Sequence, residues 1–358
     1  MVIKKLGLKN FRGLCETNIN TESKYVVFLA NNGEGKTSIL ESIYYCFTGS
    51  SFRTKDIKYL LQKNKENFEI KTEVDNNEKS FIIQAKYDDY GKSFYINDKQ
   101  IKDRKDLIYN FPTVVLVSED INFIVGSPEN KRKFFDQVIS LCDEEYLLLK
   151  KKYKSILVER NKLLKLEDKT LFNINDEILS NLIEQIQIKR KNTVNKLNDI
   201  IKDYYPIFFD KEDNIKIDYK RSIEADTSDI IYKVLKDNYD KDIEYGITRK
   251  GIHRDDFIIR KGMDNFINYA SKGQLRLLAL LYRLAEIKYI NDNNGKEPFV
   301  LIDDVFLELD KTRRKYFFES LKGYSQLFLT FLPNEDYFKI ESSNTKFYSI
   351  KDGNILAL

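Results

Sequence analysis

The chain has 358 residues, of which 42% are hydrophobic and 32% are charged. This composition excludes a disordered chain and allows one large globular domain or two smaller ones. Lysine and arginine number 60 and aspartate and glutamate 56, so the net charge of +4 permits nucleic-acid binding without arguing for it. A single histidine makes a histidine-rich metal site or catalytic centre a poor fit.

No run of the sequence reaches the 18 or so apolar residues that a membrane-spanning helix needs. The first residues, MVIKKL, lack the apolar core of a signal peptide. We therefore expect a cytoplasmic protein with no membrane partner.

The first part of the chain reads as strands and turns around one helix. Apolar residues alternate with polar ones over residues 3–8, 68–74 and 80–87, and turns rich in aspartate and asparagine follow the last two of these segments. The continuous apolar run at 111–117 predicts a strand that is buried on both faces.

The middle of the chain is helical in character. Residues 131–166 and 178–204 carry apolar side chains at helical spacing, with a polar break at 173–176 between them. We expect two antiparallel helices of roughly 30 residues and about 45 Å each, with Pro206 ending the second. This lobe can be a helical subdomain that only stabilises itself, or a lever or DNA-facing arm whose tip, near 170–176, meets a partner.

Strand signals return after residue 246, with a helix among them: strands at 257–260, 299–302 and 326–329, and a helix at 274–290. The sequence therefore predicts an α/β fold whose nucleotide-binding lobe is split. Its two parts would be residues 1–117 and 246–358, with a helical lobe at 118–245 inserted between them.

The run FLANNGEGKTS at 28–38 follows an apolar strand-like segment and precedes an amphipathic run. Strand, glycine-bearing loop and helix in this order are the setting that a phosphate-binding loop requires. The residues expected to line the nucleotide are Ala30, Asn31, Asn32, Gly33, Glu34, Gly35, Lys36, Thr37 and Ser38.

Each position in this loop has a physical role. Gly33 and Gly35 allow successive backbone N–H groups to turn toward one anion, and the helix that follows points its positive dipole end at the same place. Lys36 would bind the β and γ phosphates, and the Thr37 hydroxyl would bind Mg²⁺. Ala30 replaces the first glycine of the G-x-x-x-x-G-K-[ST] pattern, and a positive φ there would cost about 1 kcal/mol or more.

Two carboxylates far downstream complete the pattern. Asp303 and Asp304 follow the apolar strand at 299–302. We expect Asp303 to hold Mg²⁺ beside Thr37, and Asp304 to orient or deprotonate the attacking water. An ordinary acidic turn after a buried strand is the alternative. Ser271, at the start of the helix predicted next to it, can be a plain cap or part of a second anion site.

The order of nucleotide loop, helical insertion, Ser-x-Gly-Gln and apolar-Asp-Asp resembles ATPases of the ABC type. Within these, the chain resembles the RecF family of bacterial gap-repair ATPases, which are related to the heads of SMC and Rad50 proteins. Besides the loop, the runs that carry the resemblance are LKNFRGL at 8–14, TGSSFRT at 48–54, SEDINFIVGSPENKRKFFD at 118–136, GIHRDDF at 251–257, ASKGQLRLLAL at 270–280 and LIDDVFLELD at 301–310.

The resemblance implies an ATP-dependent homodimer that binds duplex DNA and duplex/single-strand junctions and works with RecO and RecR to load RecA at gaps. It implies ATP and Mg²⁺ as cofactors. Carried over residue by residue, it assigns Lys36 and Thr37 to Walker A, Asp303 to Walker B, Asp304 to a position that is glutamate in many relatives, Ser271, Gly273 and Gln274 to the signature, and Asp310 to the D-loop.

The resemblance leaves other residues with two interpretations. Arg53 resembles an arginine that approaches the phosphates in related heads, but a surface arginine fits equally well. Glu119 falls where relatives carry the Q-loop glutamine, which makes it a further candidate metal ligand. Thr330 occupies a switch position often filled by histidine; its hydroxyl can sense the γ-phosphate but is a poor base. His253 is structural or, with Arg254, supports the site, because the family places this motif in the ATPase lobe.

The implied mechanism is a clamp in which two ATP molecules lie at a two-fold interface and slow, DNA-stimulated hydrolysis releases DNA. The alternatives are an ATPase head of an SMC-like, Rad50-like or OLD-like DNA-processing complex, a transport ATPase subunit, and a dimer that has lost hydrolysis. Few residues follow Asp310, so we expect no nuclease domain and no nuclease activity.

Overall fold

The computed structural model describes residues 1–76, 78–166, 169–209, 215–333 and 344–358. It divides into two compact units: unit 1 comprises Met1–Glu119 and Glu286–Leu358, and unit 2 comprises Asp120–Ala285. The first division lies close to the boundary expected after residue 117. The second lies well beyond residue 246, because strands β9 (Ile215–Lys220) and β10 (Asp256–Lys261) pair with each other inside unit 2.

Unit 1 contains an antiparallel sheet in the order β2-β1-β4-β5-β6-β7. Its strands are β1 (Val2–Lys9), β2 (Thr17–Asn20), β4 (Phe68–Asp75), β5 (Ser80–Asp88), β6 (Gly91–Ile96) and β7 (Lys99–Gln100). The alternation that predicted three of these strands is confirmed, since Phe68, Ile70 and Val74 of β4 face the core. One face of the sheet is therefore buried and the other is polar.

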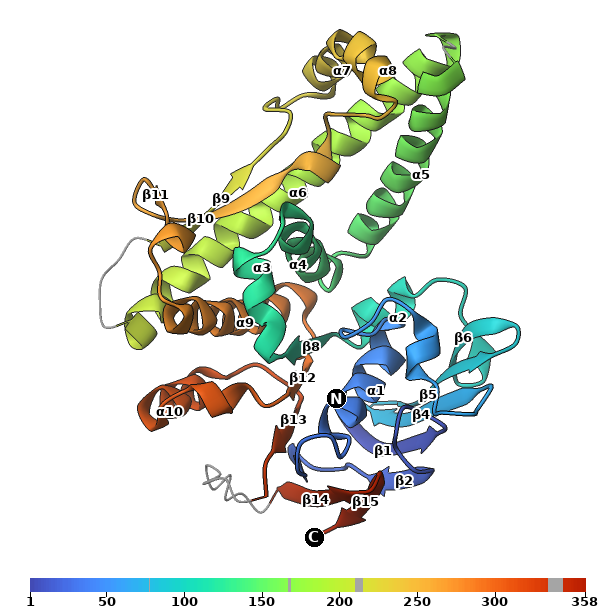
Figure 1. Ribbon diagram of the computed structural model, residues 1–358, viewed down its shortest axis with the longest axis vertical. Helices are drawn as coiled ribbons and strands as arrows, with labels where there is room; N and C mark the ends of the chain where they lie inside the picture. The colour runs from blue at the N-terminus through green and yellow to red at the C-terminus, as the bar shows by residue number, and fades with distance from the viewer. Residues whose placement is uncertain (77, 167–168, 210–214, 334–343) are drawn as a thin grey trace. The chain divides into compact units, whose positions relative to one another are not determined.

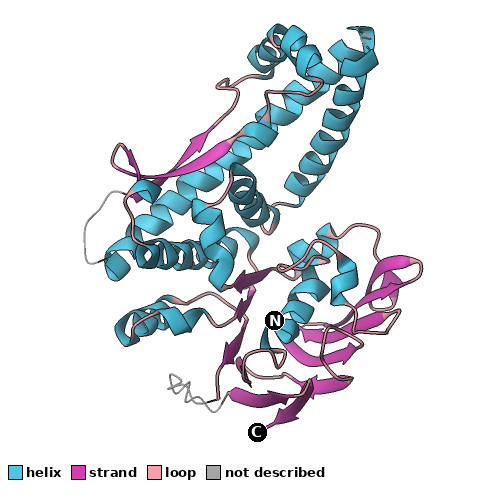
Figure 2. Ribbon diagram, viewed as in Figure 1, coloured by secondary structure: helices cyan, strands magenta, loops and turns pink. Residues whose placement is uncertain are grey.

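The second sheet of unit 1 has the order β15-β14-β3-β13-β12-β8, and every neighbouring pair except β14–β15 is parallel. Figure 2 draws the strands in magenta. Its strands are β3 (Tyr25–Leu29), β8 (Thr113–Leu116), β12 (Phe299–Ile302), β13 (Gln326–Phe331), β14 (Thr345–Lys351) and β15 (Asn354–Ala357). Helix α1 (Lys36–Thr48) packs against strands of both sheets, and Phe47 stacks on Phe299 with ring centroids 5.2 Å apart. Helices α2 (Lys105–Asn110) and α10 (Lys311–Ser320) complete unit 1.

Unit 2 is mainly helical. Its helices are α3 (Ile121–Val125), α4 (Pro128–Ser140), α5 (Glu144–Leu166), α6 (Lys169–Phe209), α7 (Ser228–Asp237) and α8 (Tyr239–Tyr245), and α9 (Lys272–Asn294) begins in it. Figure 1 shows α5 and α6 side by side. Strands β9, β10 and β11 (Asp264–Asn265) form a small sheet. Within the described ranges, no helix has the length and apolar character that crossing a membrane demands.

The predicted helix pair is confirmed in kind, but its limits differ from the expectation. Helices α5 and α6 have 23 and 41 residues, which corresponds to about 35 and about 60 Å at 1.5 Å per residue. The predicted break at 173–176 is helical, because the Asp176 carboxylate is buried and accepts a hydrogen bond from Arg160 of α5. Pro206 lies inside α6 and does not end it. The burial of Tyr205 and Phe208 on either side offsets the cost of the proline.

Candidate nucleotide-binding site

The loop between β3 and α1 has the backbone that its glycines predict. Gly33 and Gly35 have φ values of 86° and 112°. A Cβ atom on Gly35 would lie 2.7 Å from Cδ2 of Leu14. Both this close approach and the positive φ therefore favour glycine at this position. Ala30 is buried, donates its N–H to the Phe331 carbonyl of β13 at 3.1 Å, and is not among the residues with positive φ. The strain that alanine could have introduced there is therefore absent.

The loop is closed by a short ring of hydrogen bonds. Glu34 donates its N–H to the Asn31 carbonyl at 3.3 Å, and its carboxylate accepts the Asn31 N–H at 2.7 Å. The first helical bond of α1 runs from the Ile39 N–H to the Gly35 carbonyl. The N–H groups of residues 36–38 precede that bond and, with the helix dipole, favour an anion at the loop.

Parallel strands bring the downstream carboxylates to the same edge. Because Ile302 of β12 pairs with Leu329 of β13, Asp303 lies beside Thr330. The Thr330 hydroxyl donates to Asp303 Oδ1 at 2.8 Å and accepts the backbone N–H of Asp304 at 3.0 Å. Asp304 has a φ of 49°, an uncommon conformation for a residue other than glycine. Thr330 thus links the two carboxylate residues and holds the second in a strained conformation.

Lys36 extends from the start of α1 into this cluster. Its ammonium lies 3.1 Å from Asp304 Oδ1 and 3.4 Å from Asn32 Oδ1, and the side chain is only 4% exposed. A buried ammonium needs a counter-charge, which Asp304 supplies here. A triphosphate at the loop would compete with Asp304 for the same cation.

Asp303 has the surroundings of a carboxylate that can hold a hard cation. Burial raises its pKa, whereas hydrogen bonds from Thr37 and Thr330 and the charge of Lys36 act in the opposite direction. The Thr37 hydroxyl and the Asp303 carboxylate are oxygen donors of the kind that Mg²⁺ takes alongside phosphates and water. No group of three or more histidine, cysteine or acidic side chains suited to a metal occurs in the described part of the chain, but Mg²⁺ bridging to phosphates does not need one.

Three other residues that the sequence suggested for the nucleotide site have no contact with Asp303 or Thr37 in the described ranges. Glu119 is exposed, and no contact in the described ranges joins it to Asp303 or Thr37. Arg53 is 43% exposed and lies 3.3 Å from the Glu41 carboxylate of α1. Asp310 accepts the Arg313 N–H at 2.9 Å and so caps α10. The structure does not bring these residues into the Asp303 cluster.

Sequence reasoning missed one ion cluster next to the loop. Glu41 is fully buried in α1 and receives two hydrogen bonds from Arg12, at 2.9 and 2.7 Å, and another from the Ser51 hydroxyl. A buried carboxylate with such partners ties α1 to two loops. The only signal in the sequence was an acidic residue within an otherwise apolar stretch of α1.

Ser271 and Gln274 form a reciprocal cap at the start of α9. The Ser271 N–H donates to Gln274 Oε1 at 2.9 Å, and the Gln274 N–H donates to the Ser271 hydroxyl at 3.2 Å. This is the capping-box arrangement. Ser271, Gly273 and Gln274 are exposed, so the helix start is at the surface of unit 2.

The GIHRDDF run lies in unit 2, whereas the resemblance had implied the ATPase lobe. His253 Nε2 donates to the Thr248 carbonyl at 2.9 Å, so its Nδ1 accepts the Tyr153 hydroxyl at 2.6 Å. Burial lowers the pKa of His253 to about 4. Asp255 is buried and pairs with Arg190 of α6 at 2.8 Å. The run therefore holds unit 2 together, and His253 is a neutral structural residue.

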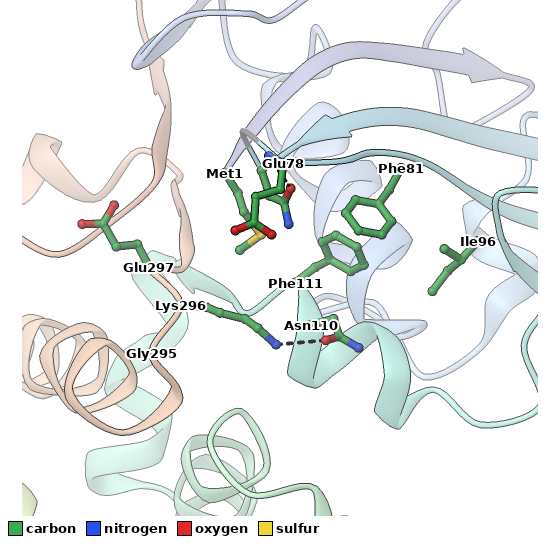
Figure 3. Close-up of a pocket in the computed structure, with 10 residues that line it drawn as sticks. Met1, Glu78, Phe81, Ile96, Asn110, Phe111, Gly295, Lys296 and Glu297 are labelled. Atoms are coloured by element: carbon green, nitrogen blue, oxygen red, sulfur yellow. Dashed lines mark hydrogen bonds between the residues drawn. The ribbon is translucent and has the colours of Figure 1, made fainter.

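A separate hollow of about 440 Å³ opens in unit 1 (Figure 3). Phe81, Ile96 and Phe111 form its apolar wall, and Lys296, which donates to Asn110 Oδ1 at 2.9 Å, lies at its edge. None of its lining residues belongs to the nucleotide loop or to the Asp303 cluster.

Comparisons with known proteins cover almost the whole chain. Residues 2–354 match the family model described as RecF/RecN/SMC N terminal domain. The chain is 33% identical to the DNA replication and repair protein RecF of Treponema pallidum, over 96% of this chain and 98% of that protein. It is 32% identical to the protein of the same name from Clostridium tetani, over 99% of each.

Solved structures give the same picture. A structure titled as the recombination mediator protein RecF-ATP in the RecFOR pathway superposes with a TM-score of 0.91 and 27% identity, covering 100% of this chain and 97% of that one. A SMC head bound to the C-winged helix domain of ScpA is similar in fold alone, with a TM-score of 0.56 and 16% identity. These similarities confirm the predicted α/β fold, an ABC-type ATPase lobe split in sequence by a helical insertion.

Proposed function

Because the chain belongs to the RecF family of DNA replication and repair proteins, we propose that it is an ATP-operated DNA clamp of recombinational repair. It binds duplex DNA and gap junctions as an ATP-stabilised homodimer in the cytoplasm. With RecO and RecR it loads RecA on single-stranded gaps. Slow hydrolysis, stimulated by DNA, then releases the DNA. The membership of a similar protein in the RecFOR pathway supports the choice of partners.

The observation that carries the proposal is the cluster formed by Lys36, Thr37, Asp303, Asp304 and Thr330. Two parallel strands and one helix N-terminus place an ammonium, two hydroxyls and two carboxylates together. Lys36 binds the β and γ phosphates, and Thr37 and Asp303 hold Mg²⁺. When bound, Mg²⁺ neutralises charge on those phosphates.

Asp304 acts on the attacking water. Its side chain is about a quarter exposed, at 24%, so water reaches it. The Asp304 carboxylate is paired through Oδ1 with the Lys36 ammonium. A triphosphate that attracts Lys36 therefore releases Asp304 to accept a hydrogen bond from water. The carboxylate of an aspartate is a weak base, which fits a slow switch.

The exposed start of α9 supports dimerisation. Ser271 and the N–H groups after it lie at the surface of unit 2, where they can meet the γ-phosphate held by a second copy. ATP then stabilises the dimer by contacts that ADP lacks. DNA is held through its phosphates, so affinity falls steeply as salt rises from about 50 to about 200 mM and depends little on sequence.

A complementation experiment tests the shared site. Lys36→Met removes the phosphate lysine, and Ser271→Arg blocks the surface that meets the partner's nucleotide. Each variant alone should hydrolyse ATP at background rate. In an equal mixture, a mixed dimer carries one intact site, formed by the loop of the Ser271→Arg copy and the α9 start of the Lys36→Met copy, so part of the wild-type rate, at most about a quarter, should return. A mixture as inactive as its components contradicts the shared site.

A second measurement tests the switch itself. Sedimentation of the wild-type protein with ATP and with ADP should show dimers only with ATP, and Lys36→Met should remain monomeric with both. Equal dimer populations with the two nucleotides would contradict an ATP-operated clamp. Turnover that is indifferent to DNA would contradict a DNA-stimulated ATPase.

A further inference from the structure

One short segment of unit 1 is rich in basic residues. Residues 53–65, here called the basic segment, contain five basic side chains and one acidic one: Arg53, Lys55, Lys58, Lys63 and Lys65 against Asp56. The local excess is +4, the same as the net charge of the whole chain. All five basic side chains are exposed. Such a concentration of charge attracts anions in a way that a mixed surface does not.

The four lysines have no carboxylate within salt-bridge distance in the described part of the chain. Some other exposed lysines are paired with carboxylates, as Lys5 is with Glu73 and Lys133 with Glu129. Unpaired lysines on a common segment repel each other, and this repulsion is relieved when a polyanion binds.

Hydrogen bonds and a buried side chain hold the backbone of the basic segment in place. Its 3₁₀ helix η1 (Ile57–Leu60) is capped by the Asp56 side chain, which accepts the Lys58 N–H at 3.0 Å. Leu60 is buried, and its carbonyl accepts the Arg12 N–H at 2.7 Å. Because the backbone is already ordered, a ligand that binds here does not have to order it.

An aromatic side chain stands among these lysines. Tyr59 is 66% exposed and sits in η1 between Lys58 and the buried Leu60. Proteins that bind single-stranded nucleic acid combine exposed aromatic rings with nearby cations. The cations bind the phosphates, and a base stacks on the ring.

We propose that the basic segment binds the phosphate backbone of DNA and that Tyr59 stacks on an unpaired base at a duplex/single-strand junction. The inference rests on the proposed function, because it names the surface by which the clamp meets DNA. A charge run on a solvated face would bind nothing; the fixed backbone and the exposed ring favour a binding surface instead.

The basic segment also has a physical connection to the nucleotide loop. Arg53 at its start and Ser51 just before it both contact the buried Glu41 carboxylate of α1. The first turn of the same helix carries Lys36 and Thr37. DNA phosphates that attract Arg53 compete with Glu41, so binding on this surface acts on the helix that holds the nucleotide. This connection supplies a route for DNA-stimulated hydrolysis.

Charge neutralisation in the full-length chain tests the surface. The test variant replaces four lysines of the basic segment with glutamine: Lys55, Lys58, Lys63 and Lys65. The matched control replaces four exposed lysines of α5 and so removes the same charge: Lys152, Lys154, Lys162 and Lys165. Thermal unfolding of both variants, compared with wild type, checks that they fold. The probe is a fluorescent gapped duplex, measured by anisotropy at several salt concentrations.

We expect the test variant to bind at least tenfold more weakly than wild type at about 100 mM salt, with a salt slope reduced by about 0.9 for each phosphate that is no longer neutralised. The control should bind as wild type does, and DNA stimulation of ATP turnover should fall only in the test variant. Equal losses in both variants, or wild-type binding by the test variant, would overturn the proposal. Failure of the wild-type protein itself to bind the gapped duplex would instead overturn the proposed function.

Substitution of the tyrosine separates stacking from charge. Tyr59→Ala should weaken binding to gapped duplex several-fold and leave binding to blunt duplex unchanged, whereas Tyr59→Phe keeps both. Tyr90, which is fully exposed at 100% on the turn between β5 and β6, provides the matched control, and Tyr90→Ala should bind both as wild type does. An equal loss on the two DNAs, or none, would remove Tyr59 from the junction.

Discussion

Thr330 connects the two carboxylates of the site, and its replacement by valine gives a sharp prediction. The hydroxyl donates to Asp303 at 2.8 Å and accepts the Asp304 N–H at 3.0 Å. Valine has nearly the same shape but makes neither bond. The lysine, the loop and the packing of β13 stay in place, so nucleotide binding should change little. The change should appear in the chemical step.

The magnitude follows from the two bonds. A hydrogen bond to a carboxylate contributes about 1.5–3 kcal/mol, and an N–H left without a partner costs about 1–3 kcal/mol. Asp304 is held at a φ of 49°, a conformation that costs about 1 kcal/mol and that relaxes once its anchor is lost. If about 2–3 kcal/mol of this is lost from the transition state, kcat falls roughly 30- to 150-fold.

Single-turnover hydrolysis by Thr330→Val, with ATP affinity measured separately at equilibrium, checks this expectation. Thr330→Ser keeps the hydroxyl and should hydrolyse within about fivefold of wild type, which makes it the matched control. Turnover by the valine variant within about threefold of wild type would refute the reasoning. So would a loss in ATP affinity that accounts for the whole effect.

Other predictions concern the loop and unit 2. Gly35→Ala should weaken ATP binding more than Gly33→Ala, because both glycines have a positive φ but only at Gly35 would a Cβ also meet Cδ2 of Leu14, at 2.7 Å; equal affinities by equilibrium titration would contradict this. The pKa of His253 is about 4 when folded, against an ordinary value of 6.5 for histidine, so the unfolded chain binds the proton and stability falls as pH drops from 6.5 to 4. Between about pH 7.5 and about pH 5.5, denaturant unfolding should show that wild type loses about 1.3 kcal/mol more than His253→Gln; parallel losses would argue against a neutral histidine. Arg190→Met should destabilise the protein by about 3–5 kcal/mol, since it leaves Asp255 buried without its partner. Adding Asp255→Asn should recover part of that loss, and unfolding curves that show no recovery would mean that the pair is not coupled.

Local rules were enough to predict the loop and the strand ends. The glycine pattern between a strand and a helix determines the backbone conformation of a loop of about ten residues. The carboxyl ends of parallel strands lie at the same edge of the sheet. Asp303 and Thr37 could therefore be expected in one place although they are far apart in the sequence. The backbone strain expected for a positive φ at Ala30 is absent, because Ala30 does not have a positive φ. The motif alone does not determine this angle.

Long-range ion pairs could not be predicted in the same way. With 60 lysine and arginine residues in the chain, nothing in the sequence marks Arg160 and Arg190 as fully buried, as they are among the described residues. Their partners lie on other helices and loops, such as Asp242 for Arg160. The GIHRDDF run was expected in the ATPase lobe from the family resemblance, and its sequence does not indicate that Asp255 pairs within unit 2 with Arg190, 65 residues away.

The pairing of Lys36 with Asp304 has a consequence for the order of events. Sequence motifs place both residues at the phosphates, but they do not say that the two side chains hold each other at 3.1 Å. Under the proposed function, Asp304 is the base and Lys36 is the cation that binds the triphosphate, and here the two are paired with each other. We therefore expect Lys36 to move to the triphosphate before Asp304 orients water or accepts its proton, so that nucleotide binding comes before activation of the water.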